Sequence, residues 1–164
     1  MDDTSRREHF HAITRSGGAL LTELPTNRGT VVLVALDGEI DLCSVTEVEK
    51  VAHAALAERP LHLVVDLAEV RFCDVRGLRL LTDTLPREAR QTGVSYTLAD
   101  VPRQLAHLMA LVRPYDRPQQ RATTAEALSA IASELVATGS SEIDLAPVRA
   151  AQHAHAGRDC PQCG

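Results

Sequence analysis

Tryptophan is absent from the sequence, and the 164 residues include only two phenylalanines and two tyrosines. Aromatic rings therefore contribute little to the core. The apolar fraction still reaches 45%, so the core must be aliphatic and built from Leu, Val, Ile and Ala. A chain of this length fits one domain of ordinary size plus a tail, and such a domain can bury a substantial core.

Three further absences limit the class of protein. Four cysteines are too few for a fold held together by disulfides, which indicates a reduced, cytoplasmic setting. No apolar run approaches the ~20 residues that cross a bilayer, and the N-terminal residues lack the apolar stretch of a signal peptide. The formal net charge is −5 without a basic cluster, which argues against nucleic acid as the main partner. We therefore expect a cytoplasmic protein that binds neither nucleic acid nor a membrane.

Composition divides the chain into three parts. Residues 1–18 are polar and end in Ser-Gly-Gly, so we expect a flexible lead. Residues 19–132 carry regular apolar patterns and form the single folded domain, whose last helix extends to about residue 136. Residues 137–164 are rich in Gly, Ser, Ala, His and Pro without periodicity, and we expect a flexible tail.

Strands and helices alternate through the central part. Apolar and β-branched runs predict strands at 20–24, 30–36, 62–65, 94–99 and 119–122. The turn residues at 37–41 end the second of these strands. Helices are expected after four N-cap residues, namely Ser44, Asp74, Asp100 and Thr123. This order predicts an α/β fold, in which helices pack over a sheet.

Several details of these helices follow from the sequence. Ser44 and Thr123 are each followed three residues later by glutamate, which is the spacing of a capping box. Pro86 lies inside the second helical pattern and should end or kink that helix near Leu85. The third helix is expected to direct four apolar residues toward the core, namely Leu105, Leu108, Met109 and Leu111.

The stretch from Leu61 to Leu81 is where we expect the function. It reads as a buried strand, a short connection that begins after Asp66, and a helix whose N-cap is Asp74. Asp74 can act as a cap alone or as a cap that also contacts a partner. Asp41 can likewise hold a turn or contact a partner. Arg76 adds positive charge beside a helix N-terminus that is already positive, so it could attract an acidic partner or an anion.

Three motifs within this pattern resemble those of the STAS domain of bacterial anti-sigma-factor antagonists. They are Gly38–Asp41 (GEID), Asp66-Leu67, and Phe72–Leu78 (FCDVRGL). Members of that family typically read G-E-[LI]-D and then D-L-S-x-[VL]-x-[FY]-[IM]-D-S-S-G-L. The resemblance covers roughly residues 19–132, and the motifs lie at the expected separation on the expected elements.

The resemblance implies a small α/β domain with a mixed sheet of four or five strands and about four helices. It also implies a partner, an anti-sigma factor with an ATPase-like serine-kinase domain, and regulation of sigma-factor-dependent transcription. The residues expected to bind this partner are Asp41, Asp74, Val75, Arg76, Gly77 and Leu78.

The chain departs from the family pattern at Val75. In the family, a serine directly after the motif aspartate is phosphorylated by the kinase, which ends the interaction. Valine has no hydroxyl to accept a phosphoryl group and carries none of the roughly −1.5 to −2 charge of phosphoserine. We therefore expect an antagonist that escapes phosphorylation at this position, or a STAS subunit that docks on a larger assembly such as a lipid-transport ATPase complex.

Three other sets of residues are candidates for different chemistry. Three carboxylates, Asp41, Asp66 and Asp74, are expected near one edge of the sheet. The sequence shows neither a nucleophile paired with a base nor a glycine-rich phosphate-binding loop, so we do not expect an enzyme. Cys73 and Cys43 are expected to be small buried thiols rather than reactive ones. In the tail, a zinc site is possible on His153, His155, Cys160 and Cys163, although a redox-active cysteine pair and an unstructured tail are alternatives.

Overall fold

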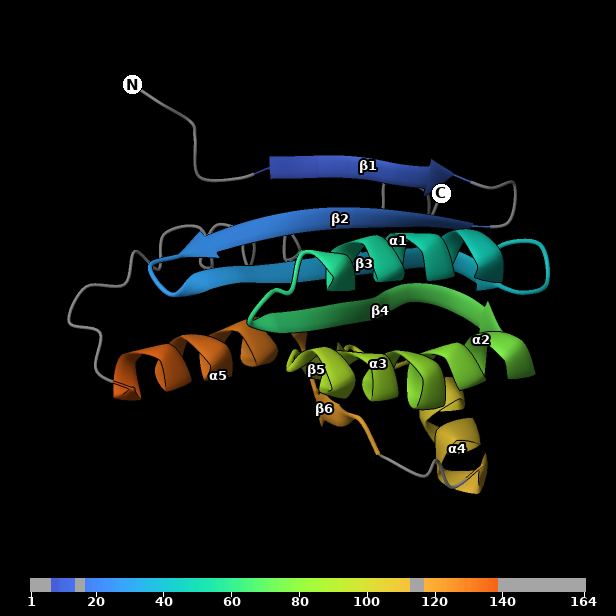
Figure 1. Cartoon of the computed structure of the whole chain (residues 1–164). Coiled ribbons are helices and arrows are strands. Elements are labelled where there is room, and N and C mark those ends of the chain that lie inside the picture. The colour runs from blue at the N-terminus through green and yellow to red at the C-terminus, as the bar shows by residue number, and fades with distance from the viewer. Residues whose placement is uncertain (1–6, 14–16, 113–116, 139–164) are drawn as a thin grey trace, which may run out of the picture.

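The computed structural model describes residues 7–13, 17–112 and 117–138; three strands come first, and strands and helices alternate after them (Figure 1). The strands are β1 (Arg7–Ile13), β2 (Gly17–Thr26), β3 (Gly29–Ile40), β4 (His62–Cys73), β5 (Ser95–Ala99) and β6 (Gln119–Arg121). The helices are α1 (Val45–Ala57), α2 (Val75–Arg79), α3 (Leu85–Thr92), α4 (Arg103–Val112) and α5 (Thr124–Ala137), and a π-helical segment, η1 (Leu80–Thr84), joins α2 to α3.

The strands form one mixed sheet of six strands in the order β1-β2-β3-β4-β5-β6. The pairs β1–β2 and β2–β3 are antiparallel, and the remaining three pairs are parallel. The expected α/β fold with a mixed sheet is thus confirmed, with one strand more than the four or five expected. The additional strand is β1, which falls in the lead that we expected to be flexible. No apolar run marks this segment, and it becomes a strand because its backbone pairs with β2.

β3 and β4 both extend beyond the strands that their sequences predict. β3 continues past Leu36 as far as Ile40, into the segment expected to end it, and β4 continues past Asp66 to Cys73. The added parts pair with each other, as Asp37 with Glu69 and Ile40 with Cys73, across two irregularities in register. Both strands therefore end side by side, directly before α1 and α2 begin.

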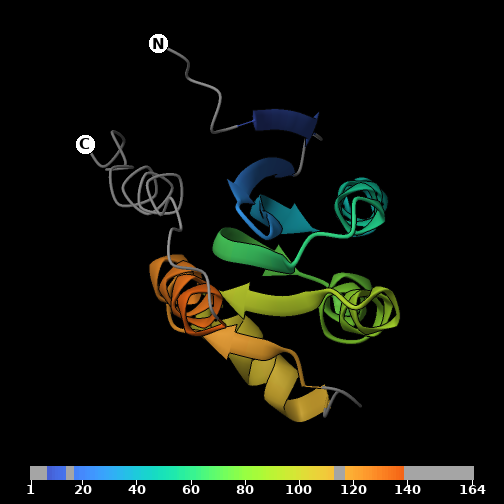
Figure 2. The ribbon, with the colours of Figure 1, turned by 60° about the vertical axis from the view of Figure 1, so that its left-hand side comes forward.

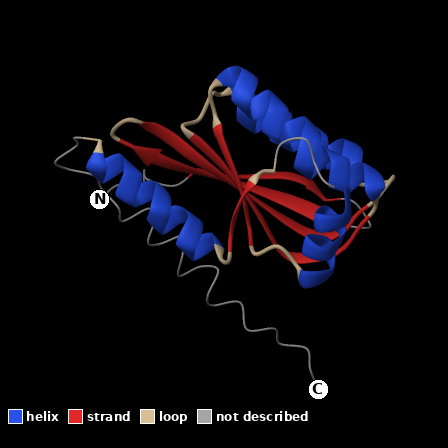
Figure 3. Cartoon of the chain, turned by 90° about the horizontal axis from the view of Figure 1, so that it is seen from below, coloured by secondary structure: helices blue, strands red, loops and turns tan. Residues whose placement is uncertain are grey.

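Helices cover both faces of the sheet (Figures 2 and 3). α1 and α3 lie on one face and α5 lies on the other. On the α5 face, Leu128 and Ile131 belong to the same buried cluster as Val31, Leu33 and Val64 of the sheet. No helix among the described residues is long and apolar enough to cross a membrane.

α4 buries a narrower stripe than its sequence predicts. Leu105 and Met109 are buried, as expected, but Leu108 is 42% exposed and Leu111 is 66% exposed. α4 lies beside the carboxyl end of β4, at the end of the sheet rather than across it (Figure 1). One stripe of α4 is therefore enough to cover the core, and two of the four expected inner residues face solvent.

Of the two outcomes predicted at Pro86, an end or a kink near Leu85, the end is wrong, because a π-helical turn directly before Leu85 accommodates the proline. The chain remains helical from α2 through η1 to α3. The Leu85 N–H donates to the Leu80 carbonyl, five residues back, and Pro86 has no N–H to donate to Leu81. The Leu81 carbonyl instead accepts a hydrogen bond from the buried Tyr96 hydroxyl on β5, at 3.1 Å.

Two predicted caps differ from the structure and one is confirmed. The Ser44 side chain makes no cap hydrogen bond to α1, so the first capping box is absent. Asp100 has a positive φ of 52° and does not cap α4; its carboxylate accepts the Thr124 N–H at 2.6 Å, at the start of α5. Thr123 caps α5 as predicted, accepting the Glu126 N–H at 3.0 Å.

Candidate functional site

Asp74 joins the ends of β3 and β4 to the start of α2. Its backbone N–H donates to the Ile40 carbonyl at 2.9 Å, which ties the two strand ends together. Its carboxylate accepts the N–H groups of Arg76 and Gly77, each at 2.8 Å. These are two of the donors that a helix start leaves without partners, so the predicted N-cap is confirmed.

Replacing Asp74 with alanine should lower the free energy of unfolding by about 0.5–2 kcal/mol, because two helix N–H groups lose their acceptor. Chemical denaturation monitored by circular dichroism measures this change. Asp74→Asn is the matched control, since asparagine caps helices about as well without the charge. Equal losses for both substitutions would contradict a simple capping role and assign the effect to the negative charge.

Asp41 holds the turn between β3 and α1. Its carboxylate accepts the N–H groups of Cys43 at 2.9 Å and Ser44 at 3.0 Å. The Ser44 hydroxyl donates to the Glu39 carbonyl at 2.6 Å and so fixes the turn to the end of β3. Of the two roles considered for Asp41, these contacts supply the structural one. They also take the place of the capping box expected at Ser44.

The residues expected to bind a partner divide by exposure. Val75 is 64% exposed and Arg76 is also exposed, so both can contact another protein. Gly77 and Leu78 are buried, and Leu78 belongs to the hydrophobic core. In this conformation these two residues position the helix start, and direct contact of either with a partner stays a prediction.

Two exposed apolar residues at the same edge were not predicted as site residues. Leu42, beside Asp41, is 64% exposed, and Phe72, near the end of β4, is 52% exposed. Phe72 belongs to the FCDVRGL motif, but its exposure could not be predicted. The apolar pattern ended the strand at residue 65, whereas Phe72 is exposed on the part of β4 that extends beyond it. With Val75, these side chains place apolar area in solvent around the start of α2.

The remaining polar and thiol groups near this edge have structural roles. Asp66 is buried, and its carboxylate accepts the Ala68 N–H at 2.9 Å. Cys73 is buried as expected, and burial, together with the neighbouring Asp74 carboxylate, raises its pKa to about 12. Its thiol therefore stays protonated and unreactive at neutral pH. Cys43 is exposed, contrary to the expectation of a buried thiol, because it lies in the turn before α1.

The described residues contain no group of three or more His, Cys, Asp or Glu side chains that could hold a metal ion. The possible zinc ligands His153, His155, Cys160 and Cys163 lie outside the described residues.

Comparison with known proteins identifies the family of this domain. Residues 25–113 match the family model described as "Mlab, STAS domain". Over 96 residues the chain is 27% identical to the anti-sigma-F factor antagonist RsfB of Mycobacterium tuberculosis, which covers 58% of this chain and 79% of RsfB.

Solved structures give the same picture. A crystal structure of an anti-sigma factor antagonist from Mycobacterium paratuberculosis is 28% identical, with a TM-score of 0.54, and the match covers 73% of this chain and 97% of that one. The anti-sigma factor antagonist SpoIIAA, in its unphosphorylated form, is 17% identical, with a TM-score of 0.50, and the match covers 76% and 97%. At that identity SpoIIAA supports the fold alone.

Proposed function

The chain belongs to the STAS domain family, and from this premise we propose that it is an anti-sigma-factor antagonist. It binds a kinase-type anti-sigma factor in the cytoplasm and so regulates transcription that depends on the corresponding sigma factor. It acts by binding and not as an enzyme. The names of its relatives in two mycobacteria support this role.

The observation that carries the proposal is the exposed loop position Val75. Asp74 fixes the backbone here through hydrogen bonds to Ile40, Arg76 and Gly77, so the loop is presented in a defined shape. Val75 itself stands in solvent with 64% of its surface exposed. The position thus suits contact with a partner, but its side chain cannot accept phosphate. We infer that the antagonist binds without phosphorylation control at this loop.

Native mass spectrometry of the full chain with kinase-type anti-sigma factors from its own genome tests the proposal. We expect a stable complex that gains no phosphate on this chain when ATP is added. Phosphate on the wild-type chain would overturn the escape from control. The absence of a complex with any of these anti-sigma factors would overturn the antagonist role.

Val75→Ser should restore the phosphoacceptor. With the partner and ATP, we expect one phosphate on residue 75 and loss of the complex, because phosphoserine adds roughly −1.5 to −2 charge at the contact. The matched control is Val75→Ala, which removes the same methyl groups without adding a hydroxyl and should keep the complex in ATP. A Val75→Ser chain that binds the partner but is never phosphorylated would contradict a kinase-type partner facing this loop.

A second candidate function is a STAS subunit that serves as a scaffold or associates with a transporter. The valine at position 75 favours it, because such a subunit needs no phosphoacceptor. Affinity purification of the tagged chain from its own cells distinguishes the two functions. Recovery of an anti-sigma factor supports the antagonist, whereas recovery of transporter subunits supports the second function.

A further inference from the structure

An apolar groove lies beside the candidate site, between the end of β4 and α4. Its volume is about 160 Å³. Its lining includes six apolar or weakly polar residues, which are Val70, Phe72, Cys73, Pro102, Leu105 and Leu108. Phe72 and Leu108 are 52% and 42% exposed, so the groove opens to solvent and its rim is apolar. We call it the Phe72 groove.

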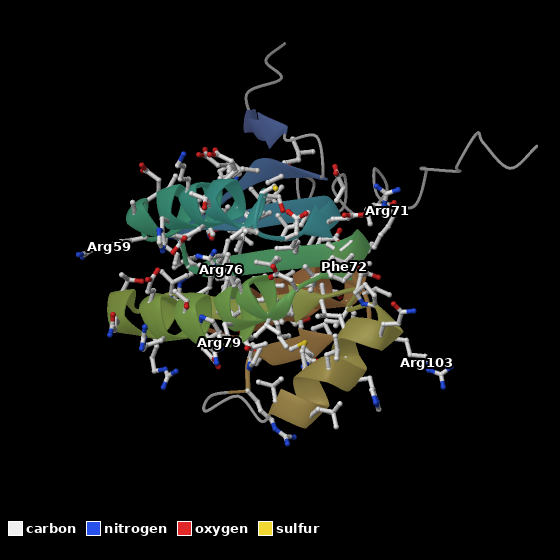
Figure 4. The ribbon with its side chains drawn as sticks, turned by 90° about the vertical axis from the view of Figure 1, so that its right-hand side faces the viewer. Arg59, Arg71, Phe72, Arg76, Arg79 and Arg103 are labelled. Atoms are coloured by element: carbon white, nitrogen blue, oxygen red, sulfur yellow. The ribbon has the colours of Figure 1, made fainter. Side chains whose placement is uncertain are left out.

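Four exposed arginines lie on the same side of the molecule as the Phe72 groove (Figure 4), and one of them, Arg71, lines it. Figure 4 shows Phe72 with Arg71 on one side, Arg76 and Arg79 on another and Arg103 on a third. All four arginines are exposed. Among the described residues, none of their guanidinium groups forms an ion pair or a hydrogen bond. The chain as a whole has a net charge of −5, so these four arginines have the opposite sign to the net charge of the protein.

The carboxylates on the adjoining strands form no ion pairs with these arginines. Glu39 faces Phe72 across the β3–β4 ladder, and Glu69 faces Asp37. Both glutamates are exposed, and neither forms an ion pair with a described arginine. The guanidinium groups are therefore available to carboxylates from another molecule.

The dimensions and charges of the groove decide what occupies it. A volume of about 160 Å³ is below the roughly 300–1,000 Å³ of small-molecule sites, but it suits one apolar anchor side chain. A second copy of this chain would place the same arginines opposite one another across a two-fold axis, and like charges repel. Arginine pairs with carboxylates through two parallel hydrogen bonds, which favours an acidic partner.

We propose that the Phe72 groove receives an apolar side chain from an acidic, amphipathic segment of the partner, whose carboxylates pair with Arg71 and Arg103. This rests on the proposed function, because it names the chemistry of the anti-sigma-factor surface that the antagonist contacts. It extends the contact from the Val75 loop across the end of β4 to α4.

The first test measures affinity for the anti-sigma factor by titration calorimetry, using the full chain. The double variant Arg71→Glu/Arg103→Glu should weaken binding at low salt by about 10-fold or more, because charge reversal turns attraction into repulsion. Arg59→Glu is the control for one charge reversal, since Arg59 is exposed and lies at the opposite edge of this view (Figure 4). It should change affinity by less than about 2-fold.

Two leucines of α4 provide a matched apolar pair. Leu108 lines the groove, whereas Leu111 is more exposed and does not line it. Leu108→Ala should weaken binding by about 5-fold or more, as expected for a buried anchor contact, and Leu111→Ala should leave it unchanged. Equal effects of the two substitutions, with wild-type binding intact, would overturn the groove while leaving the proposed function standing.

The second test does not depend on the anti-sigma factor. A synthetic amphipathic peptide that carries leucines and glutamates is titrated into the labelled full chain, and amide shifts are followed by NMR. We expect shifts at Phe72, Cys73 and Leu108 that a lysine-for-glutamate version of the peptide does not cause. If no anti-sigma factor binds but these shifts occur, the proposed function fails and the groove stands. If the acidic peptide causes no such shifts, the groove proposal is overturned.

Discussion

Replacing Gly77 with alanine is expected to lower the free energy of unfolding by about 1–3 kcal/mol, because an added methyl group has no room. A Cβ atom at Gly77 would lie 2.6 Å from Ile40 Cγ2, 2.8 Å from Cys73 Sγ and 3.0 Å from the Ile40 carbonyl oxygen. Ile40 is β-branched and buried, so it cannot turn away without moving β3. The helix start must shift instead.

The sign of this change is informative, because helix propensity predicts the opposite result. Within a helix, alanine is more favourable than glycine by about 1 kcal/mol. Urea denaturation of Gly77→Ala therefore distinguishes the two effects: a gain in stability would show that contact with Ile40 does not limit the position of α2. Arg76→Ala is the control at the adjacent exposed position and should change stability by less than about 0.5 kcal/mol.

The sequence predicts the alternation of elements, because aliphatic runs and helical periodicity are local signals. The buried strands around Val31–Val34 and Leu63–Val65 lie where their apolar runs place them. The N-cap at Asp74 is also local, since it depends on one side chain and the next two N–H groups.

The extended ends of β3 and β4 could not be predicted from apolar runs, because polar residues continue both strands. From Asp37 to Ile40 the residues are alternately exposed and buried, which is the period of a strand, yet Asp-Gly-Glu resembles a turn. The backbone of each extension is satisfied by the other, through the β3–β4 ladder. Pairing between segments that are distant in the sequence produces no apolar pattern in either segment alone.

The composition of the site surface depends on these extensions. Motif position suggested that Leu78 would contact a partner, but the helix buries it. Leu42 and Phe72 are exposed because the ends of both strands project to the same edge. Likewise, Leu108 and Leu111 are exposed because α4 lies at the end of the sheet. Sequence periodicity identifies an apolar face of a helix, but it does not say how wide the surface beneath that face is.

The hydrogen bond between Tyr96 and Leu81 also joins distant segments, and its loss should be costly. Tyr96→Phe is expected to lower the free energy of unfolding by about 1–3 kcal/mol, because the buried Leu81 carbonyl loses its side-chain donor. Burial raises the pKa of the Tyr96 hydroxyl, so it remains protonated and able to donate throughout the neutral range. Urea denaturation of the two proteins measures the difference.

Pro86 is the reason that Leu81 needs this donor, and a double-mutant cycle tests the connection. The Leu85 N–H already donates to Leu80, and a residue other than proline at position 86 would offer an N–H five residues after Leu81. In a Pro86→Ala background, Tyr96→Phe should therefore cost less, with a coupling of about 0.5 kcal/mol or more. Equal costs in both backgrounds would show that the π-helical turn does not supply a substitute donor. A smaller cost would establish that the hydroxyl of β5 stabilises a helix that a proline would otherwise interrupt.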